Sequence, residues 1–160
     1  MDAENRIGTA AQQAANSALV RDFGLLLKAA TRLELRIDTE LRRRSGISHT
    51  MFEVLIRLCR RPGESVSQRH LADDLTLTSG GVTRLVDRME EAGLVRRTPS
   101  PQDRRSVLVE PTEDGYEVFL DAAAVHAEVV RRYFAVPLSG GDYTRLTGAL
   151  GEINRALADD

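Results

Sequence analysis

The sequence predicts a mostly α-helical protein with one small β-hairpin near its centre. Apolar residues recur at steps of three and four through most of the 160 residues, which is the period of one helix face. Two short apolar runs, 93–97 and 106–110, flank a stretch with two prolines and an aspartate, which predicts a turn between two strands. The length suits one domain or two small ones, and with 4% aromatic residues the core must be aliphatic.

A long amphipathic helix is predicted from Leu19 to about Arg44. Cations in its last turn and Gly46 beyond it are typical of a helix C-terminus. A small domain cannot cover so long a stripe, so a partner subunit is its expected cover. The stripe consists of Leu19, Phe23, Leu26, Leu27, Ala30, Leu33, Ile37 and Leu41.

Three shorter helices follow, and together they predict a helix-turn-helix. Ser48 and Ser67 stand at positions where they can cap the second helix and the third, Gln68–Leu75. The turn over Thr76–Gly81 leads to a fourth helix that ends near Gly93. The inward face of this fourth helix is predicted to be Val82, Leu85, Val86 and Met89.

After the hairpin, two more helices complete the chain. Thr112 is the expected start of the fifth, and residues 137–142 separate it from the last helix, which carries Leu146, Leu150, Ile153 and Leu157. We expect part of residues 1–15 to be disordered. The predicted fold is therefore mostly α with a small β wing: a winged helix-turn-helix flanked by long dimerisation helices.

The outward face of the fourth helix suits contact with DNA. In a helix-turn-helix the second helix enters the major groove, and small polar residues at its start allow close approach to base edges. Arginine can pair with guanine through two hydrogen bonds. The alternative is an ordinary solvated helix start. The outward residues are Ser79, Gly80, Thr83, Arg84, Asp87 and Arg88.

Arginines at the hairpin strengthen the DNA hypothesis. Arg96 and Arg97 end one predicted strand, and Arg104 and Arg105 begin the other, so we expect both pairs near the fourth helix. Arginine at a hairpin tip can enter a narrow minor groove. Each arginine singly is equally compatible with plain solvation. Neither the net charge of −2 nor the arginine-rich composition is evidence for DNA binding. The hypothesis therefore depends on where the arginines lie in the predicted fold.

Residues Met51–Gly115 resemble the winged helix-turn-helix of the MarR family of bacterial transcriptional regulators. The motifs that carry the resemblance are "LADDLTLTSGGVTRLVDRMEEAGLVRR" and the following "DRR…V…PTEDG". The resemblance implies a helical dimerisation region at 16–46 and 116–160 around a DNA-binding region at 47–115. It implies a homodimer on a palindromic, inverted-repeat operator of double-stranded DNA, most commonly a repressor, released by a ligand or oxidant.

The family's DNA contacts fall on Ser79, Gly80, Thr83 and Arg84, with Arg88 further along the same helix face. Its Asp-x-Arg wing signature falls on Asp103 and Arg105. The resemblance therefore implies Arg105 in the minor groove and Arg104 on the DNA backbone. We expect Asp103 to orient a neighbouring arginine through a charge-assisted hydrogen bond.

Small aromatic or phenolic effectors of the family bind between the dimerisation and DNA-binding regions. Phe23, Leu27, His49 and Phe52 are the residues that can line such a crevice here, and plain core packing is the alternative.

Other functions find little support in the sequence. No catalytic constellation, cofactor motif or metal-ligand cluster is apparent among the scattered histidines, and Cys59 on an apolar helix face is expected to be a structural thiol. No membrane span or signal peptide is recognisable, so a cytoplasmic location is expected. An enzyme is thus disfavoured, and a winged helix that binds another protein is the remaining alternative.

Overall fold

The computed structural model describes residues 3–61, 63–103 and 105–158. These form two compact units, residues 1–36 and residues 37–160. The boundary falls within one long helix, α2 (Ala18–Ser45), whose N-terminal part belongs to the first unit and whose C-terminal part belongs to the second.

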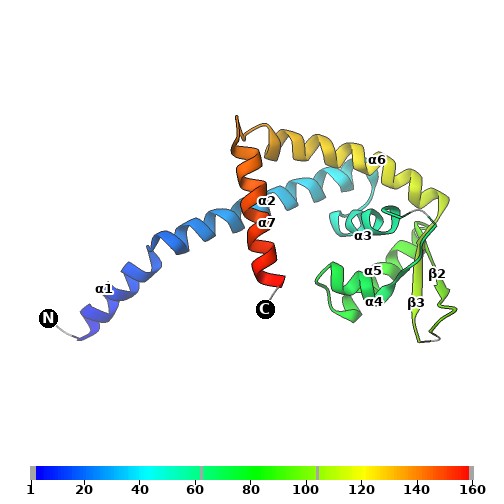
Figure 1. Ribbon diagram of the computed structural model, residues 1–160, viewed down its shortest axis with the longest axis horizontal. Helices are drawn as coiled ribbons and strands as arrows, with labels where there is room; N and C mark the ends of the chain where they lie inside the picture. The colour runs from blue at the N-terminus through cyan, green and yellow to red at the C-terminus, as the bar shows by residue number, and fades with distance from the viewer. Residues whose placement is uncertain (1–2, 62, 104, 159–160) are drawn as a thin grey trace. The chain divides into compact units, whose positions relative to one another are not determined.

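The first unit contains α1 (Ala3–Ala15) and the N-terminal part of α2, up to Arg36 (Figure 1). The sequence predicts partial disorder over residues 1–15, whereas the structure has a helix there. Alanine and glutamine, which favour helices, dominate the second half of this segment. The predicted long helix is confirmed, and its apolar residues from Leu19 to Leu27 are exposed.

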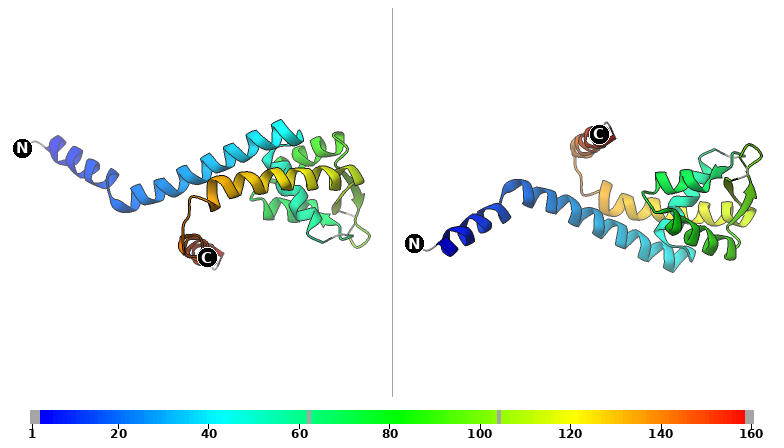
Figure 2. Two further views of the ribbon diagram at one scale, coloured as in Figure 1. Left: turned by 90° about the horizontal axis from the view of Figure 1, so that it is seen from above. Right: turned by 90° about the horizontal axis from the view of Figure 1, so that it is seen from below.

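The second unit holds the predicted helix-turn-helix and hairpin. In both views of Figure 2 these elements group closely together. The elements after α2 are α3 (His49–Cys59), β1 (Val66–Ser67), α4 (Gln68–Asp74), α5 (Ser79–Glu91), β2 (Val95–Pro99), β3 (Val107–Pro111), α6 (Glu113–Val130), the π-helical turn η1 (Arg131–Ala135) and α7 (Asp142–Ala158).

Local capping explains where these helices begin. Ser48, Ser67 and Thr112 accept hydrogen bonds from the backbone N–H groups of Met51, His70 and Gly115, which confirms the three predicted starts. Thr78, which the sequence assigns to the turn, caps α5 in the same way by accepting from Gly81 N at 3.1 Å.

The core of the second unit lies between α3, α4, α5, α6 and the sheet, and it is aliphatic apart from Phe52. The predicted inward face of α5 is confirmed, because Val82, Leu85, Val86 and Met89 are all buried. These contacts fix which face of α5 remains for solvent. The fully buried side chains outside α5 include Leu41, Leu55, Leu58, Leu71 and Val109.

The sheet has three antiparallel strands in the order β1-β3-β2. Val95 pairs with Pro111 at the base of the hairpin, and Pro99 pairs with Val107 near its tip. The first wing strand begins two residues later than predicted. Gly93, with φ at +74°, ends α5 first, and this left-handed backbone conformation is available to glycine without strain.

A tight junction joins the hairpin to α6. Thr112 Oγ1 donates to Gly93 O at 2.6 Å and accepts from Gly115 N at 3.0 Å. A Cβ on Gly115 would lie 2.0 Å from Leu94 O, so no side chain fits there without moving backbone. This junction sets the direction in which the hairpin leaves the domain.

Candidate nucleic-acid interface

The outward face of α5 presents the small and cationic side chains that the sequence predicts. Ser79, Gly80, Thr83, Arg84 and Arg88 are all exposed. Nothing lies within 4 Å of the Cβ position of Gly80, so the helix start has open space in front of it. The side chains of Arg84 and Arg88 bond to no residue that the structure describes, which leaves both guanidinium groups free for an external partner.

The hydroxyl group of Thr83 is already used within the protein. Thr83 Oγ1 donates to Ser79 O at 2.9 Å and accepts from Gln68 Nε2 at 2.7 Å. Since its one hydrogen is committed, this hydroxyl can offer a DNA base only a remaining lone pair, together with the methyl group. Gln68 on α4 thereby ties the first helix of the helix-turn-helix to the second.

Arg97 on β2 braces the hairpin against α5. Its Nη1 lies 2.8 Å from Glu90 Oε2, and its Nη2 lies 2.7 Å from Asp87 Oδ1. Its Nε donates to Gln68 Oε1 at 3.2 Å, and its Nη2 also donates to Thr83 O. With a side chain only 21% exposed, Arg97 is occupied inside the protein and is not an external probe.

Arg96 is likewise committed, although its side chain is exposed. Its Nη2 lies 2.9 Å from Glu110 Oε2 on β3, and this pairing, with a hydrogen bond from Ser65, holds the pKa of Glu110 below its usual value. The sequence predicts that both arginine pairs lie near α5 as one cationic face. Arg97 does lie beside α5, but it is bonded to that helix, while Arg96 is bonded to β3, so both are engaged within the protein and Arg105 lies at the tip.

The tip is a compact hydrogen-bonded turn. Ser100 is buried, and its Oγ accepts from the backbone N–H groups of Gln102 and Asp103. Asp103 Oδ1 accepts from the backbone N–H of Arg105 at 2.9 Å. The carboxylate thus positions Arg105 through a charge-assisted hydrogen bond to the main chain. Arg104 lies outside the described residues.

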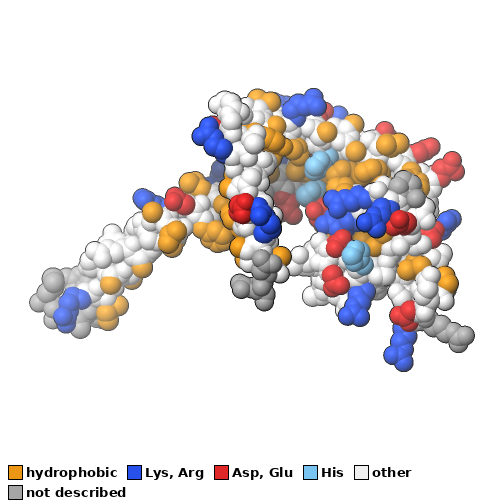
Figure 3. All heavy atoms as spheres, in the orientation of Figure 1, with side chains coloured by type: hydrophobic (Ala, Val, Ile, Leu, Met, Phe, Trp, Pro, Cys, Tyr) orange, Lys and Arg blue, Asp and Glu red, His pale blue; other side chains and the backbone are white. Residues whose placement is uncertain are grey.

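An open groove of about 700 Å³ brings the hairpin tip and the helix-turn-helix together. Asp103 and Arg105 line it from the tip, and Ser79 lines it from the start of α5. Figure 3 shows basic side chains projecting on the side where α4, α5 and the hairpin tip lie. Residues of α4, which sequence reasoning did not select, also line the groove. They are Gln68, Arg69, Ala72 and Asp73.

The four predicted effector residues fall in both units. Phe23 and Leu27 lie on α2 in residues 1–36 and are 59% and 52% exposed. Phe52, on α3 in the second unit, is 2% exposed and stacks on Phe119 of α6, with ring centroids 5.6 Å apart. This contact gives Phe52 a place in the core.

His49, at the start of α3, stacks on His126 of α6, with ring centroids 5.9 Å apart. Phe52 lies 4.8 Å from the same His126 ring. Burial lowers the pKa of His126, and the nearby His49 lowers it further, while Glu53 acts in the opposite sense. Sequence reasoning treats the three histidines as scattered and does not detect this pair, because its members are joined only by the packing of α6 on α3.

Potential metal ligands do not gather into a site in the described part of the chain. No group of three or more His, Cys, Asp or Glu side chains among residues 3–61, 63–103 and 105–158 could hold a metal ion. Burial raises the pKa of the Cys59 thiol, which disfavours the reactive thiolate. None of the described helices is both long enough and apolar enough to cross a bilayer.

Comparison with known proteins agrees with this geometry. The model of the MarR family matches residues 47–107. The transcriptional regulator PecS of Dickeya dadantii is 29% identical over 140 residues, which cover 85% of this chain and 84% of PecS.

Two solved structures are similar over most of the chain. A MarR-family regulator from Streptomyces coelicolor in complex with DNA is 30% identical, with a TM-score of 0.79, and the match covers 89% of this chain and 91% of that one. CouR from Rhodococcus jostii, bound to p-coumaroyl-CoA, is also 30% identical, with a TM-score of 0.74 and coverages of 89% and 96%.

Proposed function

The chain belongs to the MarR family of DNA-binding transcriptional regulators, and from this premise we propose that it is a repressor that binds a palindromic operator as a homodimer and leaves it when a small effector binds. The observation that carries the proposal is the groove that Ser79 of α5 shares with Arg105 of the hairpin tip. A reading helix and a wing that line one groove suit simultaneous contact with adjacent grooves of one duplex.

Within this proposal, α5 lies in the major groove with Ser79, Gly80, Arg84 and Arg88 toward the DNA. The open space in front of Gly80 permits close approach of the helix backbone to the DNA. The guanidinium group of Arg84 can pair with guanine through two hydrogen bonds. Thr83 contacts the DNA through its methyl group or as an acceptor. Arg105 enters the minor groove, held by Asp103. The backbone contact of Arg104 stays a prediction.

Homodimer formation is supported by apolar side chains that the single chain leaves exposed on its long helices. Leu120 on α6 and Leu157 on α7 are examples, and α7 has no buried residue. One recognition helix contacts only a few base pairs. A two-fold dimer places two such helices about 34–36 Å apart, in successive major grooves, and thereby reads an inverted repeat.

The proposed effector is a small aromatic or phenolic molecule, and within the second unit His49 is the predicted residue left to contact it, because Phe52 is buried in the core. CouR, a relative at 30% identity, was solved with the phenolic thioester p-coumaroyl-CoA, which supports this chemical class. The His49–His126 pair offers imidazole nitrogens beside an aromatic wall, which suits a phenol or carboxylate group. We also place the protein in the cytoplasm on the basis of this function.

The test is specific binding to an inverted repeat, selected from the DNA that co-purifies with the protein. Binding should weaken steeply as salt rises, since phosphate contacts release counterions. Arg84→Ala should lose about 1–3 kcal/mol of binding free energy and relax specificity at one base position, because a bidentate arginine–guanine contact is lost. A flat salt response, or no preferred sequence, would contradict the proposal.

The alternative of a winged helix that binds another protein makes a different prediction. In that case Arg84→Ala and Arg105→Ala would leave partner binding intact, and no duplex would bind the wild-type chain. The described residues offer no specific support for an enzyme, so we propose no catalytic activity.

A further inference from the structure

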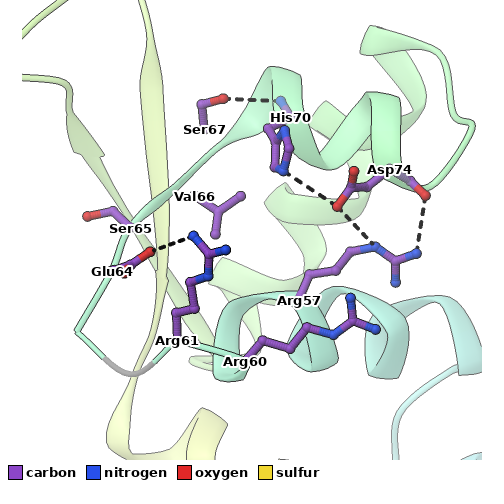
Figure 4. A pocket seen from close by; sticks show the side chains of 9 residues that line it. All are labelled: Arg57, Arg60, Arg61, Glu64, Ser65, Val66, Ser67, His70 and Asp74. Carbon is purple, nitrogen blue, oxygen red and sulfur yellow. Dashed lines mark hydrogen bonds and ion pairs between the residues drawn. The ribbon is translucent and has the colours of Figure 1, made fainter.

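A second cavity, separate from the groove at the hairpin tip, opens between the end of α3, β1 and α4 (Figure 4). Its volume is about 530 Å³, enough for a small molecule rather than a single ion. Three arginines, Arg57, Arg60 and Arg61, line it from the α3 side. Ser67 and His70 line it from the α4 side, together with Asp74. The proposed DNA contacts do not include any of these residues.

Most charges in this cavity already have partners. Arg57 Nη1 donates to Glu53 O at 2.9 Å, and its Nη2 donates to Asp74 O at 3.1 Å. Asp74 Oδ2 also lies 3.6 Å from His70 Nε2. Arg57 Nε lies 3.9 Å from Asp74 Oδ2, and Arg61 Nη1 lies 3.4 Å from Glu64 Oε2, so each of the two carboxylates in the lining has a cationic neighbour. These contacts hold the walls of the cavity in place.

Arg60 is the exception. Its guanidinium group bonds to no residue in the described part of the chain, yet the side chain extends from the end of α3 in the same direction as that of Arg57. Two similarly charged side chains that extend together favour an anion as the missing partner. Ser67 adds a donor from the other wall, since its Oγ accepts from His70 N and its own hydrogen remains available.

We propose that this cavity binds a small molecule through phosphate or carboxylate oxygens, with Arg60 as the main contact. The guanidinium group is a planar fork of donors that matches both oxyanions in two-point contact. The net charge of the lining supports this class, because three arginines face two carboxylates. The site is separate from the proposed interface with DNA and from the proposed effector residues.

The experiment is isothermal titration of the full-length protein with sodium pyrophosphate at low salt, with citrate in a parallel arm. The matched variants are Arg60→Ala and Arg69→Ala. Arg69 is the sequence neighbour of His70 but lines the other groove, and it is exposed like Arg60. Each variant removes one cation from the same domain, and thermal unfolding checks that both are folded.

We expect one bound pyrophosphate per chain. Arg60→Ala should weaken binding about tenfold or more, and Arg69→Ala should stay within about twofold of wild type. Tighter binding of pyrophosphate than of citrate, or the reverse, would support the site and identify which oxyanion it prefers. Absence of binding, or equal weakening by both variants, would overturn the proposal. So would a loss of duplex DNA binding in Arg60→Ala as large as in Arg105→Ala, because the cavity would then serve the DNA backbone.

Discussion

Arg96 and Arg105 are wing residues of the same type with different surroundings. Arg96 is paired with Glu110 across the hairpin, whereas Arg105 lines the groove shared with α5. Charge alone predicts the same contribution to DNA binding from both. Their partners predict different contributions, and this difference can be measured.

Arg105→Ala should weaken DNA binding by about 1–3 kcal/mol, with the larger losses on sites that have A·T-rich flanks. Arg96→Ala, the matched control, should change the free energy of DNA binding by no more than about 0.5 kcal/mol, because the Arg96 guanidinium group is already paired with Glu110. The loss of this exposed ion pair should also cost the fold little stability. Fluorescence anisotropy titrations at one fixed salt concentration measure both. Equal losses for the two variants would show that only net charge matters.

His126 makes stability depend on pH. Its folded pKa is lowered, first by burial and then by His49, so the unfolded chain binds this proton more readily than the folded chain. The folded state is therefore at full stability above about pH 6.5, the ordinary histidine pKa, and it loses stability as the pH falls below that value.

His126→Gln should reduce this loss between about pH 7 and pH 5. His70→Gln is the control, because His70 is exposed and lies outside the α3–α6 contact. Urea unfolding at a series of pH values measures the effect. If the two variants have the same pH profile, His126 is not the group responsible.

At the scale of elements, the junction between the hairpin and α6 depends on one glycine. Gly115→Ala places a methyl group against Leu94 O, a backbone atom that cannot turn away as a side chain would. We expect a loss of about 2–3 kcal/mol in the free energy of unfolding, which is typical of overpacking.

Gly148→Ala in α7 is the matched control, since nothing lies within 4 Å of its Cβ position. Alanine is the better helix former, so this variant should equal or exceed wild type by up to about 1 kcal/mol. Chemical denaturation compares the two. A Gly115→Ala protein as stable as wild type would mean that the junction relaxes freely.

Arg97 also acts at this scale. It joins β2 to α5 through Asp87 and Glu90 and reaches α4 through Gln68. Three elements are thereby aligned by one side chain. The orientation of the recognition helix relative to the wing is thus set by hydrogen bonds as well as by the apolar core.

For the whole molecule, the exposed apolar side chains of the long helices predict association. In solution we expect a dimer of twice the 17.7 kDa chain mass. Ile153→Glu should shift the protein toward monomer, because Ile153 is an apolar side chain on α7 that the single chain leaves 48% exposed.

Asn154→Glu, the matched control, adds the same charge one residue further along α7. Size-exclusion chromatography with light scattering distinguishes the two species. A wild-type monomer, or equal behaviour of both variants, would refute a dimer built on this face of α7.

The sequence by itself determined the features that depend on neighbours along the chain. The inward face of the recognition helix, its end near Gly93 and the caps at Ser48, Ser67 and Thr112 follow from periodicity and from side chains that bond within three residues. These interactions act over one or two helical turns, so they can be predicted without knowledge of the tertiary structure. The long helix and the hairpin can be predicted for the same reason.

Only the tertiary structure decided which of these residues are free to act. Arg96 and Arg97 are as cationic as Arg105, but Glu110, Asp87 and Glu90 engage them within the protein. His49 likewise meets His126 only because α6 packs on α3. The side chain of a residue determines its chemistry. Its partners come from segments far away in sequence, and these segments meet only through the packing of the whole domain.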